Sequence, residues 1–303
     1  MSASVKVSLT AVVLTGFAAL LGCQAPSSVP YPATIRPVAF LVERIVGSRM
    51  SEALVHPGRN PETYDPSVAD LLQFRDCRAL FYVSPVLDGW AANFKECQAQ
   101  SILEPTATGQ GKGHTHAHGI TLLEAPLSPE SIHDHGAGFS DGDPHFWTDP
   151  HRILEVLPRL ERTLVALEPE SENRIREEVQ ILGRQLEEME SEAARRLAHL
   201  KGKRAVLMHP TYRSFLEEHG LVIVAVVEPT PGKELSVLEW RQLLSRTPVD
   251  LIIHERQLPM RPARILAKEL NAQIVELDPM GAEARNLTEL LNNQLSSLAN
   301  VRF

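Results

Sequence analysis

A histidine between two aspartate-proline steps is the residue of this sequence best suited to bind a metal ion in a defined position. It is His145, in the segment DPHFWTDP at residues 143–150. Because each proline disfavours helix in the residue before it, this segment should be extended and rigid. Five further histidines lie upstream in a long loop at residues 109–138: His114, His116, His118, His133 and His135. A histidine-rich loop leading to a rigid histidine favours metal capture followed by metal placement, whereas the alternative is a solvated polar loop with one buried histidine.

Three other candidate ligands follow predicted strands. Glu62 lies in the turn-rich loop after a predicted strand of the first half, and His209 and Asp278 each follow a predicted strand of the second half. In parallel sheets, ligands bind beyond the carboxyl ends of the strands. We therefore expect these three side chains and His145 to face one cleft and hold a single ion.

Two further residues compete for a place in this site. His56 precedes the Glu62 turn and could reach the ion if the loop bends, and Glu255 ends another predicted strand as a weaker candidate. Four protein ligands would close the site to substrate, which favours binding over catalysis. The alternative is a metallohydrolase with three ligands, one water, and Glu62 or Glu255 as the general base. The sequence contains no HExxH motif, however.

The elements that must position these residues alternate along the chain. Predicted strands alternate with predicted helices in both halves, which is typical of parallel sheets in an α/β fold. Apolar residues at three- and four-residue spacing predict a stiff helix at 150–170 that connects the halves, with a kink or break at Pro158. A second long helix is predicted at 171–200, and a further helix at 88–97.

The amino terminus is predicted to be a targeting segment. Lys6 precedes an apolar run of signal-peptide length that ends in Leu-Leu-Gly-Cys23, which resembles a bacterial lipobox. We expect a signal peptide at 1–23 with lipidation at Cys23. Because Leu21 is large for its place, cleavage by an ordinary signal peptidase is the alternative, and an uncleaved membrane anchor is disfavoured by the shortness of the run.

The remaining boundaries follow from composition and periodicity. A tether rich in proline and serine is expected at 24–34, the first lobe at 35–149, the linker helix at 150–170 and the second lobe at 171–303. The formal net charge is −8, and no long basic run occurs, so we expect no binding to nucleic acid.

Export would place Cys77 and Cys97 in a compartment that permits disulfides. The sequence leaves open whether the two pair, because pairing depends on their geometry. A bridge would stabilise the fold by about 3 kcal/mol through loop closure.

Four segments together resemble those of the cluster A-I solute-binding proteins, the metal-binding subunits of bacterial zinc and manganese import systems. DPHFWTDP fits the second-ligand motif of that family, and HPTYRSF, TPGKE and LDPMG are similar to later family segments in the same order. The resemblance covers about residues 35–281. It implies two Rossmann-like lobes with parallel sheets, joined by a long helix, with a metal cleft between them.

One position departs from the family pattern, because Glu62 stands where the family usually has histidine. A carboxylate can still bind zinc through oxygen, but it makes the site harder and more tolerant of manganese. In this family a histidine loop accompanies zinc, so the resemblance implies Zn²⁺, with Mn²⁺ as the alternative. Because zinc needs neutral imidazole, affinity should fall as the pH drops toward about 6.5.

The function implied by the resemblance is transport and not catalysis. We expect a monomeric lipoprotein, periplasmic or at the cell surface and held to the membrane by its lipid anchor. It would capture zinc and deliver it to the permease of an ABC importer. A surface adhesin or a metal buffer without a transporter is the alternative.

Overall fold

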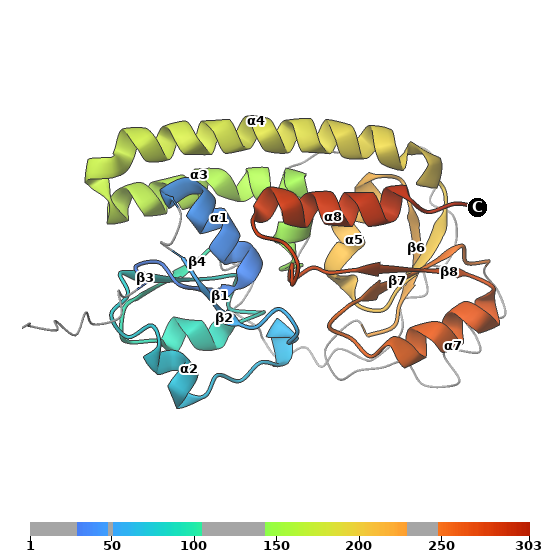
Figure 1. Ribbon diagram of the computed structural model, residues 1–303, viewed down its shortest axis with the longest axis horizontal. Helices are drawn as coiled ribbons and strands as arrows, with labels where there is room; N and C mark the ends of the chain where they lie inside the picture. Colours follow the sequence, from blue (N-terminus) through green and yellow to red (C-terminus); the bar gives the residue numbers. More distant parts are fainter. Residues whose placement is uncertain (1–28, 48–50, 105–142, 229–247) are drawn as a thin grey trace, which may run out of the picture.

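The chain folds into two lobes that follow one another in sequence, each built on a parallel sheet of four strands (Figure 1). The computed structural model describes residues 29–47, 51–104, 143–228 and 248–303. The predicted signal segment with Cys23, the five histidines of the long loop and the TPGKE segment lie outside the described residues. In the described part of the chain, no helix combines the length and apolar character needed to span a membrane. The predicted α/β fold with two parallel sheets is confirmed.

The first lobe has the strand order β2-β1-β3-β4, with every neighbouring pair parallel. Its strands are β1 (Ala33–Ile35), β2 (Ala53–Val55), β3 (Ala79–Tyr82) and β4 (Gln98–Ser101), and its helices are α1 (Arg36–Val46) and α2 (Val68–Leu72). Helix α1 begins directly after β1, with Pro37 in its first turn, where the fixed backbone angle of proline suits a helix start. The apolar side of α1 then packs into the core of this lobe.

The second lobe repeats this architecture with the strand order β6-β5-β7-β8. It contains β5 (Arg204–Leu207), β6 (Val222–Val226), β7 (Leu251–Glu255) and β8 (Gln273–Leu277), with α5 (Arg213–Glu218), α7 (Met260–Leu270) and α8 (Leu287–Ala299). Along β7, Leu251 and Ile253 face the core shared with α5 and α8, whereas Ile252 faces α7. Both faces of the sheet are therefore buried, which explains the continuous apolar run of β7.

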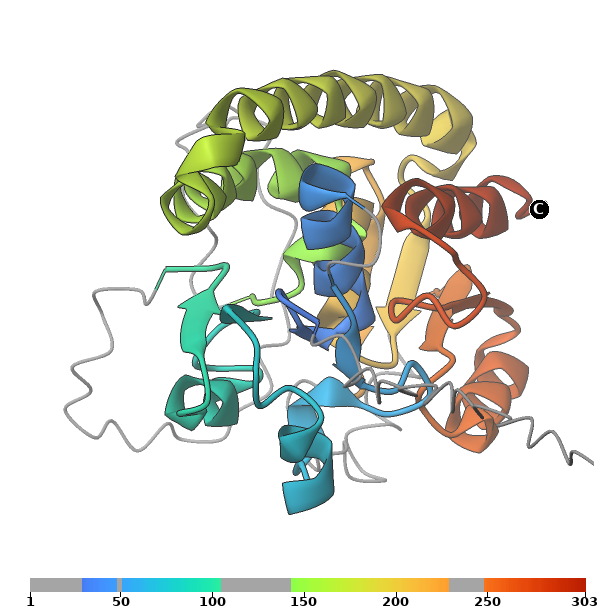
Figure 2. The same cartoon turned by 60° about the vertical axis from the view of Figure 1, so that its left-hand side comes forward.

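The lobes are connected by two helices, α3 (Pro150–Leu167) and α4 (Glu172–Leu197). Helix α3 returns over the first lobe, and α4 runs above both lobes (Figures 1 and 2). Leu182 and Leu186 of α4 lie in the core of the first lobe, whereas Leu197 lies in that of the second. The structure therefore assigns the connection to α4, and not to residues 150–170 alone, because one apolar stripe serves both cores.

Three local predictions differ from the structure. Pro158 neither breaks nor ends α3, which continues through it with the proline on the exposed side. The predicted tether at 24–34 overlaps β1, and Tyr31 is fully buried. The predicted helix at 88–97 is instead a short 3-10 helix, Gly89–Asn93, and Trp90 and Phe94 pack against the core as partly buried residues.

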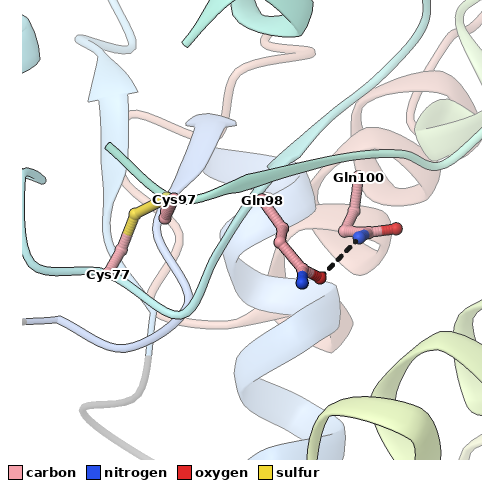
Figure 3. The surroundings of a disulfide bond; sticks show 4 residues. All are labelled: Cys77, Cys97, Gln98 and Gln100. Carbon is pink, nitrogen blue, oxygen red and sulfur yellow. Dashed lines mark hydrogen bonds between the residues drawn. A yellow bond between two sulfur atoms is a disulfide. The ribbon is translucent and has the colours of Figure 1, made fainter. Parts of the chain in front are cut away.

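Cys77 and Cys97 form a disulfide with a Cα–Cα distance of 5.6 Å (Figure 3). The two cysteines precede β3 and β4, whose first residues, Ala79 and Gln98, are paired in the sheet. The bond therefore attaches the polar edge strand β4 to its neighbour at the amino ends of the strands. A disulfide of this kind is typical of proteins outside the cytoplasm.

Candidate metal centre

Glu62 is positioned by a short turn that follows β2. The turn is the 3-10 helix Pro61–Thr63, and the side chain of Asn60 caps it by accepting a hydrogen bond of 2.9 Å from the Glu62 backbone nitrogen. The Glu62 side chain is 13% exposed and reaches two histidines outside this turn. The cap thus fixes the backbone from which the carboxylate extends into the seam between the lobes.

His145 is held in one orientation by a neighbouring carboxylate. Its Nδ1 lies 2.8 Å from Oδ1 of Asp143, and its Nε2 lies 3.0 Å from Oε1 of Glu62. Arg152 holds Asp143 in turn, through bonds of 2.9 Å to Oδ2 and 2.8 Å to the backbone oxygen. A carboxylate behind Nδ1 sets the tautomer and the ring angle that a metal-binding histidine needs, so Nε2 is the atom presented to the seam.

His209 follows β5 in the second lobe and mirrors this arrangement. Its Nδ1 lies 3.0 Å from the backbone oxygen of Glu228, and its Nε2 lies 3.0 Å from Oε1 of Glu62. Because a carbonyl oxygen only accepts hydrogen bonds, Nδ1 of His209 carries the proton. Both imidazoles therefore present Nε2 to the same carboxylate oxygen.

The ligand atoms of Glu62, His145 and His209 all lie within 4.8 Å of one another. A cavity of about 20 Å³ adjoins them, and Glu255 and Gln257 also line it. This volume suits roughly one water-sized particle. Residues from both lobes and from the segment between them thus bring together three donor atoms that could hold one small ion.

Charges within the cluster are strongly coupled. Burial alone would raise the pKa of Glu62, but the hydrogen bonds from His145 and His209 lower it to about 2. Burial alone would lower the pKa of His145, but Asp143 and Glu62 raise it to about 9. The pKa of His209 is also raised, by Glu62 and Glu255 against the effect of burial. The carboxylate thus favours positive charge at the position where a cation would bind.

Asp278 was predicted as the fourth ligand, but the structure does not bring it together with the other three. Its Oδ1 accepts hydrogen bonds of 3.1 Å from the backbone nitrogens of Met280 and Gly281, and its Oδ2 accepts one of 2.6 Å from Ala282. Its Oδ1 also accepts a bond of 2.8 Å from Gln257. Asp278 follows the edge strand β8 and caps the turn after it, so its oxygens are used there.

Glu255 lines the cavity beside the cluster but does not belong to the group of three ligand atoms. It ends β7, which neighbours β5 in the sheet, whereas β8 lies one strand further out. Glu255 is 5% exposed and lines the cavity, and burial raises its pKa despite the opposing charges of His209 and His145. Loops that follow the adjacent strands at the reversal of strand order form the usual ligand crevice of such sheets.

The alternative ligand His56 lies outside the cluster. Its side chain is exposed, and it borders a different cavity, beside Arg36 and Glu43. The sequence interpretation also missed Asp143 and the backbone oxygen of Glu228, which orient the two imidazoles. The Asp-Pro-His spacing could have revealed Asp143, whereas the contact of Glu228 with His209 depends on the pairing of β5 with β6.

Three hydrogen bonds join the second lobe to the segment that carries His145 and to the loop that carries Glu62. Trp147 Nε1 donates to the backbone oxygen of Pro279 at 3.0 Å, and Thr148 Oγ1 donates to that of Thr211 at 2.9 Å. Gln257 Nε2 donates to the backbone oxygen of Pro57 at 2.7 Å. The relative position of the ligands is therefore coupled to the contact between the lobes.

Comparison with known proteins matches most of the chain to one family. The family profile described as ZnuA, zinc-uptake complex component A, periplasmic, matches residues 32–301. Zinc-binding protein AdcA of Streptococcus pyogenes is 23% identical over 257 residues, covering 82% of this chain and 49% of that protein. Zinc-binding lipoprotein AdcA of Streptococcus pneumoniae is 22% identical over 280 residues, covering 90% and 54%. The chain therefore spans about half the length of these curated relatives.

The same fold occurs in a solved structure. The crystal structure of ZnuA superimposes with a TM-score of 0.68 at 21% sequence identity, covering 90% of this chain and 98% of that chain. The two lobes and their connecting helices therefore follow a known architecture.

Proposed function

The chain belongs to the family of periplasmic A components of zinc-uptake complexes, and on this premise we propose that it binds one zinc ion between its lobes. The observation that carries the proposal is the convergence of Glu62, His145 and His209, whose ligand atoms lie within 4.8 Å of one another. One oxygen and two imidazole nitrogens are suitable zinc donors. We propose that Glu255, which lines the cavity, neutralises the bound ion or completes its ligand set.

Zinc is preferred to manganese because of the two imidazoles. Imidazole suits zinc, whereas carboxylate and water suit manganese. Glu62 and Glu255 make the donor set harder than a purely histidine site, so manganese binding at lower affinity is the second candidate.

We further propose that the protein acts outside the cytoplasm and delivers its ion to the permease of an ABC importer. The family description as a component of a periplasmic uptake complex supports this role, as does the Cys77–Cys97 disulfide. Lipidation at Cys23 would hold the protein at the membrane, and the pneumococcal relative is itself named a lipoprotein.

Equilibrium dialysis of the purified mature chain tests the zinc site. We expect one tightly bound zinc ion, lost in His145→Ala and retained in His56→Ala, which removes an exposed histidine outside the cluster. Undiminished tight binding by His145→Ala would contradict the proposal. A strong loss in His56→Ala would transfer the site to the alternative ligand.

Deletion of residues 109–138 tests the predicted capture role of the histidine-rich loop. Loading should become slower or transfer to the permease weaker, while the tight site keeps its affinity. If the deletion abolishes tight binding, these histidines belong to the main site.

A further inference from the structure

Gln257 lies beside the candidate metal centre, and its amide group is held in one orientation. It follows β7, and its Nε2 donates a hydrogen bond of 2.7 Å to the backbone oxygen of Pro57 and one of 2.8 Å to Oδ1 of Asp278. A carbonyl and a carboxylate oxygen both accept hydrogen bonds. The two bonds therefore use both protons of the amide nitrogen and assign the other atom of the amide as the oxygen.

The amide oxygen of Gln257 is buried, and it has no hydrogen-bond partner among the residues that the structure describes. The Gln257 side chain also lines the cavity of about 20 Å³ that adjoins Glu62, His145 and His209. A buried acceptor that receives no hydrogen bond is unfavourable unless a ligand compensates it. The cavity thus combines three metal-binding atoms with a fourth side-chain oxygen that is free to bind a ligand.

Three side-chain donors at this cavity are directed to other atoms. The Nε2 atoms of His145 and His209 each lie 3.0 Å from Oε1 of Glu62. Trp147 Nε1 donates to a backbone oxygen of the second lobe at 3.0 Å. A cation held in the cavity would therefore give the oxygen of Gln257 the positive partner that these side chains do not supply.

We propose that Oε1 of Gln257 is a further donor to the ion in this cavity and that it determines how strongly the site prefers zinc to manganese. This inference rests on the proposed metal site between the lobes. A neutral carbonyl oxygen suits manganese more than zinc, whose usual protein ligands are imidazole, thiolate and carboxylate. Gln257 should therefore reduce the preference for zinc that the two imidazoles create. Since its nitrogen bonds to Pro57 of the first lobe, the same amide would connect the ion to the contact between the lobes.

Crystals of the mature chain grown with zinc or with manganese test the donor directly. Anomalous scattering should place the ion against Glu62, His145 and His209, with Oε1 of Gln257 within roughly 2.5 Å of it. An ion bound by those three residues, with Oε1 outside that distance, would overturn this inference and leave the proposed function standing. No ion in the seam, at concentrations that saturate the protein in solution, would contradict both.

Gln257→Leu and Thr148→Val form a matched pair of variants. Both remove a hydrogen bond across the seam with little change in shape, since Thr148 Oγ1 donates to the backbone oxygen of Thr211 at 2.9 Å. Of the two residues, only Gln257 lines the cavity. Gln257→Leu should weaken manganese binding about tenfold more than zinc binding, because the harder ion loses more with a neutral oxygen donor. Thr148→Val should weaken the binding of both ions by the same factor.

Calorimetric titrations with zinc chloride and with manganese chloride measure both affinities, and their ratio separates a donor from a residue that only joins the lobes. Gln257→Glu, which keeps an oxygen but loses the bonds of the amide nitrogen, should retain the wild-type ratio of manganese to zinc affinity or raise it. An unchanged ratio in Gln257→Leu would overturn the proposal. An equal fall of the ratio in Gln257→Glu or in Thr148→Val would do the same.

Discussion

Glu62 is the residue on which the candidate metal centre converges, because its Oε1 atom lies 3.0 Å from Nε2 of both His145 and His209. Because the pKa of His145 is raised to about 9, its Nε2 carries a proton at neutral pH, in the position where a metal ion would bind. Binding of a cation must therefore displace protons from imidazoles that Glu62 stabilises in the charged form.

Removing the shared carboxylate should weaken zinc binding at least about tenfold, since Glu62→Gln keeps the shape and loses the anionic ligand. Isothermal titration calorimetry of Glu62→Gln against wild type measures the loss, with exposed Glu52→Gln as the control. Equal affinities in all three proteins would show that Glu62 does not bind the ion.

Asp143 contacts Nδ1 of His145, so in the proposed site it would act on a bound ion only through the orientation of that ring. Asp143→Asn should therefore lower zinc affinity about 10- to 100-fold, the usual effect of losing the partner of a metal-binding histidine. Titrations of Asp143→Asn and of Asp65→Asn, which changes an exposed carboxylate, separate this effect from general loss of charge. Retention of full affinity by Asp143→Asn would remove the orienting role.

The pH range over which zinc affinity rises should lie higher than it would for a site with ordinary histidine pKa values. Since the pKa of His145 is raised to about 9, zinc competes with a proton throughout the neutral range, and affinity should rise until about pH 9. The sequence alone placed this change near about pH 6.5. Calorimetric titrations at several pH values, in buffers of different ionisation enthalpy, measure both the zinc affinity and the number of protons released. A zinc affinity that does not change between roughly pH 7 and pH 9 would contradict the prediction.

The stability of the metal-free protein should fall with rising pH on the alkaline side, whereas zinc affinity should rise. A raised pKa means that the stability contributed by protonated His145 is present below about pH 6.5 and is lost as the pH rises through about 9. The lowered pKa of Glu62 means that its contribution is present above 4.5 and is lost as the pH falls through about 2. Denaturant unfolding in chelator should therefore show the largest stabilisation by His145 and Glu62 between about pH 4.5 and about pH 6.5. A free energy of unfolding that increases toward pH 9 would contradict this prediction.

At the scale of elements, the carboxyl ends of the strands carry the chemistry and their amino ends carry the disulfide. Glu62 and His209 follow β2 and β5, whereas Cys77 and Cys97 precede β3 and β4. Because the strands of each sheet are parallel, these two functions are separated along the strand direction. Stability and metal affinity should therefore respond to different substitutions.

The double variant Cys77→Ser/Cys97→Ser should lower the free energy of unfolding by about 3 kcal/mol, because the disulfide closes a loop with a sequence separation of 20 residues. Zinc affinity of the folded variant should stay within roughly twofold of wild type, since neither cysteine lines the cavity. Urea unfolding and calorimetric titration measure the two quantities. A large loss of affinity with little loss of stability would contradict this separation.

At the scale of the whole molecule, a contact between the lobes lies beside the candidate metal centre. Gln257 accompanies the ligands at the cavity and bonds to both Pro57 and Asp278. Helix α4 contributes to the cores of both lobes and so limits how far they can separate. We therefore expect bonds across the seam to slow release of a bound ion more than its approach.

Gln257→Ala should accelerate zinc dissociation several-fold and leave association nearly unchanged, since most affinity differences within one interface arise from dissociation. Stopped-flow exchange with a fluorescent chelator measures the dissociation rate, with Gln180→Ala on the exposed side of α4 as the control. An unchanged dissociation rate would show that this bond does not hold the lobes together around the ion.

The sequence by itself determined the alternation of strands and helices and the strand ends that carry Glu62 and His209. The segment with His145 was predicted to be extended, but Phe146–Thr148 form a 3-10 helix that leads into α3. The alternation and the strand ends follow from local periodicity, which depends on near neighbours along the chain. Strand order does not, because it is set by contacts between distant residues. Only the tertiary structure decided that Glu255 on β7, and not Asp278 after the edge strand β8, lies beside His209, that α4 joins the two cores, and that Cys77 meets Cys97.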